Sequence, residues 1–252
     1  MNATLRSPSL SVQRGILGAV LLVLCWEGLA RGLHLPSYTL PAVSEILAGI
    51  WSKRALLGEA ASYTLLEALV GYGLGCLIGI GLAVAITMLP PLRAVILPAA
   101  TAINSVPVVG YSPLILLWFG IGIASKVVMV AMAVSFTVFL STLAGLDRVD
   151  RRAIDLMRSF GAGRLNILWR LRLPTALPLL LSGMRVSTVR SVLIAVITEM
   201  LGAYGGLGWV IYQAVLQIDF VQVWSAIFVA SAASLSFFGL IGFLERKILF
   251  WT

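Results

Sequence analysis

The chemically informative residues of this chain are two ionisable side chains inside an apolar stretch. Arg190 and Glu199 both fall between residues 179 and 201, a run long enough to cross a bilayer. Charged groups at membrane depth are costly and usually face protein or a water-filled path. At 1.5 Å per residue, Arg190 lies about 16 Å into the run and Glu199 about 13 Å further, so the two do not pair directly. Arg190 therefore lines the path of an anionic solute, is paired within the protein, for example with Glu67, or lies nearer the cytosol because the span starts later.

Three further polar residues are weaker candidates for the lining of such a path. Asn104, Ser105 and Tyr111 lie in another apolar stretch of the chain. Small polar residues in membrane spans more often mediate the packing of helices against one another. Together with Arg190 and Glu199 they form the predicted lining of a translocation path, against the alternative that they only hold helices together.

Catalysis is not predicted for this chain. His34 is the only histidine, so neither a His-based zinc site nor a catalytic triad can be built. Cys25 and Cys76 lie in apolar stretches and are interpreted as small buried hydrophobic residues rather than as a disulfide or metal ligands. The chain lacks the G-x-x-x-x-G-K-[ST] phosphate loop and is not expected to bind ATP by that route. We therefore expect no enzyme activity, no cofactor and no metal in the chain itself.

The composition predicts an all-α polytopic membrane protein. The 252 residues are 60% hydrophobic and 11% charged, with a mean hydropathy of +1.03. A soluble domain would carry roughly 25% charged residues. The net charge of +8 does not require a nucleic-acid partner, because basic residues also gather on one side of a membrane protein. One transmembrane domain is expected over residues 1–252.

Six apolar stretches are predicted to span the membrane. They cover residues 16–30, 65–89, 94–119, 127–146, 179–201 and 223–244. With the N-terminus inside, twelve Lys and Arg residues fall in cytoplasmic segments and four in outer segments. Because basic residues favour the cytoplasmic side, this predicts six spans with both termini in the cytoplasm.

Two shorter stretches are predicted to form amphipathic helices at the outer surface. Each places its apolar residues on one helical face and is too short to span. The first face comprises Val43, Ile46, Leu47, Ile50 and Trp51, and the second comprises Leu207, Val210, Ile211, Ala214, Val215 and Ile218. Periodicity alone leaves open whether they cover the end of the bundle or gate it.

The loop from residue 147 to residue 178 is predicted to fold into a compact elbow on the cytoplasmic side. It holds seven arginines. Its first helix is expected to be capped by Asp147 or Asp150, to share an apolar face (Val149, Ala153, Met157 and Phe160), and to end at Gly161. A second helix from Gly163 presents Leu165, Leu168 and Trp169, and Pro174 and Pro178 are expected to interrupt it. Composition alone would favour an elbow lying on anionic lipid.

Three glycines in the second predicted span form a stripe at intervals of four residues. Gly71, Gly75 and Gly79 would allow another helix to approach closely. The stripe could serve contact between two copies of the chain or packing within one copy, and we favour the second.

The spacing within the elbow resembles the cytoplasmic motif of ABC importer permeases. That motif reads E-A-A, three residues, Gly, nine residues, Ile, one residue, Leu-Pro. Here Asp155-Leu156-Met157 takes the place of the first triplet, Gly161 the glycine, Leu171 the isoleucine and Leu173-Pro174 the end. The glycine and Leu-Pro spacing match without a gap, whereas the triplet departs from the pattern.

Further segments resemble the nitrate, sulfonate and taurine branch of these permeases. They are residues 71–81, Val106-Pro107, PLILLWFGIG at 113–122, Ser125-Lys126, Gly161-Ala162 and residues 205–208, so the resemblance runs from about Leu35 onward. It implies the type I importer fold and a coupling helix formed by Asp155, Leu156, Met157, Gly161, Ala162, Leu171, Leu173 and Pro174.

The same resemblance implies a location in the bacterial plasma membrane, partners and a solute. The implied partners are a second copy of the chain, a separate ATPase dimer that binds ATP and Mg, an extracytoplasmic binding protein and the surrounding lipid. The implied solute is small and anionic, such as taurine, a sulfonate or nitrate; bicarbonate and a pyrimidine stay open. The alternative is a stand-alone secondary carrier, a class that often shows repeat-related broken helices, and no internal repeat is visible here.

Overall fold

The computed structural model describes residues 8–33, 36 and 38–248, and this part of the chain is helical without strands. His34, the only histidine, and Arg6, one of the twelve basic residues assigned to cytoplasmic segments, lie outside the described residues. The elements are α1 (Pro8–Gly32), α2 (Val43–Ser52), α3 (Arg54–Met88), α4 (Pro90–Ser105), η1 (Val108–Tyr111), α5 (Ser112–Phe119), α6 (Ile123–Asp147), α7 (Arg151–Ser159), α8 (Arg164–Ile167), η2 (Leu168–Arg172), α9 (Leu173–Leu201), α10 (Leu207–Leu216) and α11 (Phe220–Ile248).

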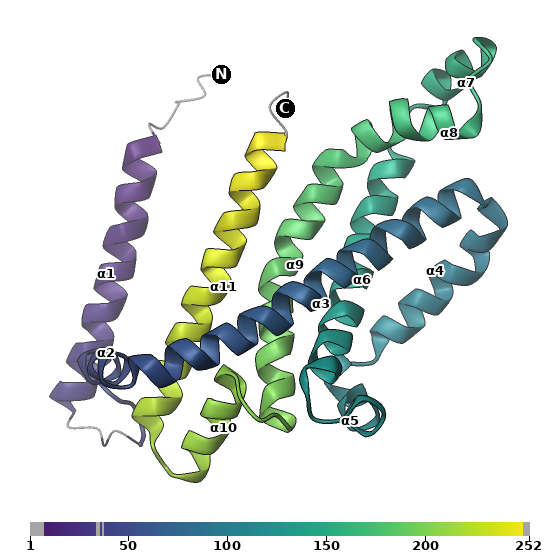
Figure 1. Ribbon diagram of the computed structural model, residues 1–252. Helices are drawn as coiled ribbons and strands as arrows, with labels where there is room; N and C mark the ends of the chain where they lie inside the picture. Colours follow the sequence, from purple (N-terminus) through teal and green to yellow (C-terminus); the bar gives the residue numbers. More distant parts are fainter. Residues whose placement is uncertain (1–7, 34–35, 37, 249–252) are drawn as a thin grey trace.

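The long helices form a bundle whose centre is made by α3, α6 and α9 (Figure 1). The largest buried apolar cluster joins these helices and includes Met129, Val134, Val138 and Ala195, all fully buried. Helix α11 packs on α9 and on the two short helices α2 and α10, while α1 stands at the edge. The start of α1 and the end of α11 lie at the same end of the bundle as α7, and we call the opposite end the distal end (Figure 1).

Among the described residues, five helices are long and apolar enough to span a membrane, and a sixth span results if a bent pair is counted as one. That pair, α4 with η1 and α5, corresponds to the predicted span at 94–119, and it is bent by 85°. The bend falls where Pro107 disfavours helical geometry at Val106, which is extended (φ −85°, ψ 129°). The other five predicted spans are confirmed as the cores of α1, α3, α6, α9 and α11.

Helix α3 begins eleven residues before the predicted span. Its 35 residues make it about 52 Å long, well beyond the hydrocarbon thickness of about 30 Å. In Figure 1 it runs diagonally across the bundle, from α2 at the distal end to α4 beside the elbow. Polar residues such as Glu59 and Ser62 hid this first part from the hydropathy pattern.

The glycine stripe on α3 packs within the subunit, as favoured above. A Cβ atom at Gly71 would lie 2.6 Å from the Val130 Cβ, and one at Gly75 would lie 2.7 Å from the Val134 Cβ. Both valines belong to α6, so the stripe is the surface through which α3 and α6 approach. Gly73 and Gly81, on other faces of α3, meet nothing within 4 Å.

Both predicted amphipathic helices are present, and their apolar faces cover the bundle only in part. Ile46 of α2 is buried against α11, whereas Leu47 and Trp51 are exposed. The first four predicted residues of the α10 stripe, from Leu207 to Ala214, are buried, but Val215 is exposed. Ile218 is exposed as well, because α10 ends at Leu216 and the chain turns there with a positive φ of 59° at Ile218.

A salt bridge and hydrogen bonds of Lys53 join two helices at the distal end. Lys53 donates to Asp219 (2.8 Å) and to the Gln222 side chain (2.5 Å), which links the α2–α3 junction to the start of α11. Partial burial of Asp219 raises its pKa, but the hydrogen bonds from Lys53 and from the backbone amide of Gln222 outweigh this and leave the pKa lowered.

The two cysteines differ in burial. Cys76 is buried, as predicted, whereas Cys25 is exposed on α1, so its predicted burial was wrong.

Candidate functional site

The elbow formed by α7 and α8 projects beyond the bundle (Figure 1). Asp150 is its N-cap: the carboxylate accepts a hydrogen bond from the Arg152 amide (2.9 Å), which selects Asp150 over Asp147. Asp147 instead accepts from Arg93 at 2.7 Å. At the other end, the Gly161 amide donates to the Arg158 carbonyl and the Ala162 amide to the Met157 carbonyl. This hydrogen-bond pair ends a helix with a left-handed residue, and Gly161 has a φ of +79°.

A small apolar cluster holds the two arms of the elbow together. Val149, Ile154 and Ile167 are its buried members, and Met157, Ala162 and Leu171 pack around them. The predicted apolar face of the first helix was wrong at Phe160, whose side chain is 82% exposed. The reason is local: α7 ends at Ser159, so Phe160 lies beyond the last regular turn.

The second arm is continuous with the membrane helix, contrary to the predicted interruption. Helical structure runs from Arg164 to Leu201 without a break. Pro174 is accommodated directly after the wide π-helical turn η2, where the regular backbone hydrogen bonding is already altered. Pro178 is accommodated inside α9. The elbow is therefore joined to α9 by continuous helical structure.

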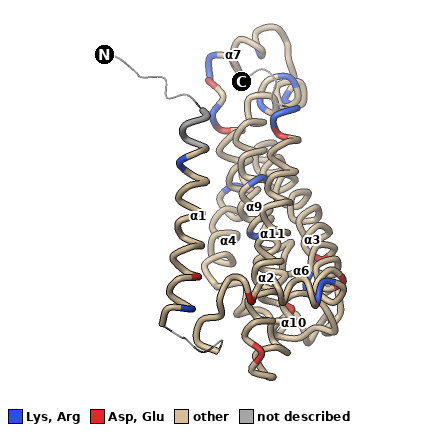
Figure 2. Tube along the Cα trace, turned by 90° about the vertical axis from the view of Figure 1, so that its left-hand side faces the viewer, with Lys and Arg blue, Asp and Glu red and all other residues tan. Residues whose placement is uncertain are grey.

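The outer surface of the elbow combines exposed apolar side chains with basic ones. Its exposed apolar residues are Leu156, Phe160, Leu165 and Trp169, each at least 59% exposed. Leu168 is buried, with 3% of its surface exposed, whereas Leu165 and Trp169 are exposed. The three residues of the predicted apolar face of the second helix are therefore not buried together. Figure 2 shows basic residues gathered at this end of the molecule. Of the predicted coupling residues, Asp155 and Leu156 are exposed, Pro174 is also exposed, and Met157, Ala162, Leu171 and Leu173 are partly buried.

A second candidate site lies inside the bundle. A cavity of about 230 Å³ is bounded by α3, α4, η1 and α6, and Asn104 and Tyr111 line it. Arg190 reaches this region from α9, donating to the Thr137 hydroxyl at 3.1 Å and contacting the Asn104 side-chain oxygen at 3.5 Å. The structure therefore brings together three of the five predicted path residues.

The other two predicted path residues lie apart from this cavity. Ser105 is exposed and its hydroxyl donates to the Thr101 carbonyl. Glu199 is buried at the distal end, where its carboxylate accepts from the Gly208 amide at 2.6 Å. The suggested pairing of Arg190 with Glu67 is not formed: among the described residues the Arg190 side chain bonds to Thr137 and Asn104 only.

Sequence reasoning missed a buried charged cluster at the distal end. It consists of Glu67 on α3, Lys126 on α6 and Glu199 on α9, all at most 5% exposed. Lys126 was counted as a loop residue outside the membrane, but it is fully buried and donates to the Ile121 carbonyl at 2.5 Å and to the Gly202 carbonyl. Its position directly after the polar Ser125 at the start of an apolar run was the available signal.

A membrane bundle with a projecting, capped elbow and a cavity between its helices is an arrangement suited to a transport permease. The chain belongs to the family of binding-protein-dependent transport system inner membrane components, whose model matches residues 75–250. It is thus a multi-pass permease subunit of an ABC importer, and not the ATPase subunit.

Individual relatives agree with this membership. The formylaminopyrimidine transport permease protein of Halalkalibacterium halodurans is 30% identical over 92% of this chain and 93% of its own length. The taurine transport system permease protein of Escherichia coli (strain K12) is 30% identical over 78% of this chain and 74% of its own length. In fold, the chain is similar to an inward-facing MetNI methionine ABC transporter, with a TM-score of 0.67 and 20% identity, over 78% of this chain and 96% of the other.

Proposed function

We propose that this chain forms the membrane path of an ATP-driven importer for a small anionic solute of the taurine and sulfonate class. In this proposal two copies of the chain form the path, an extracytoplasmic binding protein delivers the solute, and a separate ATPase dimer binds ATP and Mg. The elbow is the coupling helix, and Asp155, Leu156, Met157, Gly161 and Ala162 form or position its contact with the ATPase.

The exposed apolar surface of the elbow carries this proposal. Leu156, Phe160, Leu165 and Trp169 project from a segment that lies beyond the bundle. Apolar side chains clustered on an exposed surface with a polar rim are typical of a protein interface. Because the second arm continues into α9, a partner that grips the elbow would act directly on a membrane helix. This supports a separate motor protein rather than a carrier that works alone.

The proposed orientation places the elbow, the start of α1 and the end of α11 in the cytoplasm. The seven arginines of residues 148–172 support this, because basic residues near membrane helices favour the cytoplasmic side. The distal end, with α2, α5 and α10, then faces the binding protein.

The anionic solute is proposed from the Arg190 region. The guanidinium lies in the membrane-spanning part of α9 beside the cavity, with hydroxyl and amide partners and no salt bridge among the described residues. A cationic group without an ionic partner in that position favours an anion. The taurine permease among the relatives supports a sulfonate, whereas the formylaminopyrimidine permease at equal identity favours a different solute.

Purification of the tagged chain from its native membrane in mild detergent tests the importer proposal. We expect an ATPase subunit to co-purify in equal number, identified by mass spectrometry, together with a second copy of the chain. A chain recovered alone, which still transports after reconstitution without ATP, would contradict the proposal and favour a secondary carrier.

Arg190→Gln is expected to reduce uptake of anionic solutes by at least about tenfold, because the loss of one charge-assisted hydrogen bond is worth roughly 1.5–3 kcal/mol. Uptake of labelled taurine, an alkanesulfonate and nitrate into proteoliposomes that hold the complete transporter measures the effect. Arg190→Lys keeps the charge and should retain part of the uptake. Equal rates and an unchanged order of preference in Arg190→Gln would show that Arg190 does not face the path.

A further inference from the structure

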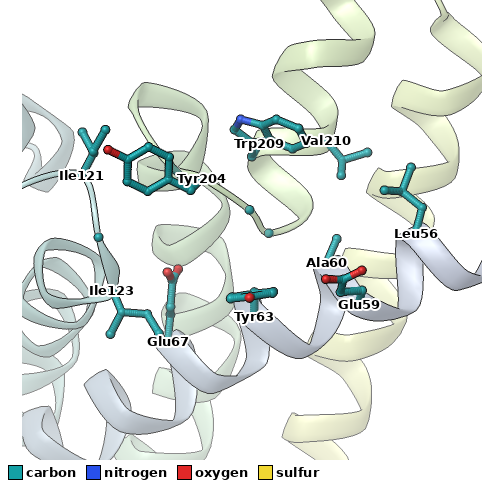
Figure 3. A pocket seen from close by; sticks show the side chains of 14 residues that line it. Leu56, Glu59, Ala60, Tyr63, Glu67, Ile121, Ile123, Tyr204, Trp209 and Val210 are labelled. Atoms are coloured by element: carbon teal, nitrogen blue, oxygen red, sulfur yellow. The ribbon is translucent and has the colours of Figure 1, made fainter.

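A second cavity opens at the distal end of the bundle, away from Arg190. Its volume is about 320 Å³, and it lies between α3, the α5–α6 loop and the loop that precedes α10. Figure 3 shows the side chains that line it. They include two carboxylates, Glu59 and Glu67, and three aromatic rings, Tyr63, Tyr204 and Trp209, but no lysine or arginine.

Glu67 is the member of this lining that indicates a ligand. Its residue is only 5% exposed, and its Oε2 atom has no hydrogen-bond partner in the structure. In Figure 3 the carboxyl group points from α3 towards the loop that carries Tyr204. A buried carboxyl oxygen without a hydrogen-bond partner is costly. Glu67 therefore needs either a shared proton or an added positive charge beside it.

The neighbouring charges do not meet this need. The Lys126 ammonium group is turned to two backbone carbonyls, those of Ile121 and Gly202. The carboxyl groups of Glu67 and Glu199 lie within hydrogen-bonding reach of each other, and Glu199 also has an unpartnered oxygen, Oε1. Two carboxylates only accept hydrogen bonds, so the pair requires either a shared proton or an added cation. With one ammonium group for two carboxylates, the ionised cluster carries an excess negative charge.

The aromatic side chains decide which kind of cation fits. Tyr63 and Tyr204 are exposed at the mouth of the cavity, and Trp209 lines its wall (Figure 3). Aromatic faces attract organic ammonium groups and are the usual walls of quaternary ammonium sites. An inorganic ion would instead need a shell of oxygen ligands, and the described residues hold no cluster of three or more His, Cys, Asp or Glu residues that could hold a metal ion.

We propose that the distal cavity is a binding subsite for a protonated amine or quaternary ammonium group, with Glu67 as its counter-ion and Tyr63, Tyr204 and Trp209 as its aromatic walls. The subsite rests on the proposed importer function and adds to it the recognition of a positively charged group at the distal end.

Saturation-transfer NMR on the full-length chain in lipid nanodiscs tests the subsite without any need for ATP. The probes are choline and its neutral isostere 3,3-dimethyl-1-butanol. We expect choline to bind at least about tenfold more tightly than the isostere, because a buried charge pair is worth at least 1.5 kcal/mol. Equal signals from both probes, or none from choline, would overturn the proposal and leave a shared proton as the partner of the two carboxylates.

Three variants locate the binding. Glu67→Gln should weaken choline binding at least about tenfold, whereas the exposed Glu59→Gln should weaken it only about twofold, because exposed charges are screened. Tyr204→Leu changes a 78% exposed side chain, so it should leave the fold intact while weakening choline binding about two- to fivefold. Full choline affinity in Glu67→Gln, or in Tyr204→Leu if Glu67→Gln does not fold, would contradict the subsite. If the chain co-purifies with an ATPase subunit but does not bind choline, the subsite is contradicted while the proposed importer function stands.

Discussion

Gly161→Val is expected to uncouple ATP hydrolysis from transport while the protein still inserts into the membrane. Gly161 has a φ of +79°, which a β-branched residue adopts only with strain. A left-handed residue costs about 1–2 kcal/mol for a non-glycine residue, so the native elbow should be disfavoured about tenfold. We expect solute moved per ATP hydrolysed to fall about tenfold or more in proteoliposomes, and Gly161→Pro should act in the same direction.

A matched variant lies two residues away. Gly163 belongs to the same loop but has an ordinary extended conformation (φ −72°, ψ 166°). A Cβ atom at either Gly161 or Gly163 would meet nothing within 4 Å, so steric crowding does not distinguish the two positions. Gly163→Val should therefore remain coupled, and Gly161→Asn, which tolerates a positive φ, should lie between the two valines. Normal coupling in a purified Gly161→Val complex would show that the elbow geometry is not needed.

The second large effect is expected at Gly79→Val, which should prevent stable assembly of the bundle. A Cβ atom at Gly79 would lie 2.5 Å from the Ser135 carbonyl oxygen and 2.9 Å from the Phe139 amide nitrogen. These are backbone atoms of α6, so the contact is relieved only if α3 and α6 separate. Overpacking typically costs about 1–3 kcal/mol, and a backbone clash at the most extensive helix contact should reach the upper end of this range.

The control for this prediction is Gly81→Val on the same helix. A Cβ atom there meets nothing within 4 Å, so the change adds a similar side chain with no clash. Size-exclusion profiles and melting temperatures of the detergent-solubilised proteins compare the two. We expect a monodisperse peak for Gly81→Val and aggregation or a strongly lowered melting temperature for Gly79→Val. Equal behaviour would mean that the stripe does not carry the α3–α6 contact.

Much of the fold is predictable from hydropathy and small-residue spacing. Membrane spans must be continuous and apolar, so the centres of five helices are readable directly, and the Gly71–Gly75–Gly79 stripe indicates where two helices approach. The bend at Val106-Pro107 is less readable, because a proline can kink a span or end it. The first eleven residues of α3 were missed because a polar helix end leaves no hydropathy signal.

The elbow is predictable to within a few residues because its signals are local. Asp150 as a cap and Gly161 as a terminator act on the backbone next to them. The distal cluster is different, since Glu67, Lys126 and Glu199 come from three helices and are neighbours only after the bundle has assembled. For Arg190, the sequence predicts the depth in the membrane from its place within an apolar run. It does not predict the hydrogen-bond partners Thr137 and Asn104, because they come from other helices.

The attachment of α1 has a consequence for the order in which the membrane domain is completed during synthesis. Trp26 stacks edge-on against Trp224 of α11, with ring centroids 5.0 Å apart, and also contacts Phe228. These partners are translated roughly 200 residues after Trp26, which at about 5–20 residues per second corresponds to a wait of about 10–40 s. Helix α1 therefore cannot complete its aromatic contacts until α11 has been synthesised, so the edge of the bundle is one of the last parts of this domain to be assembled.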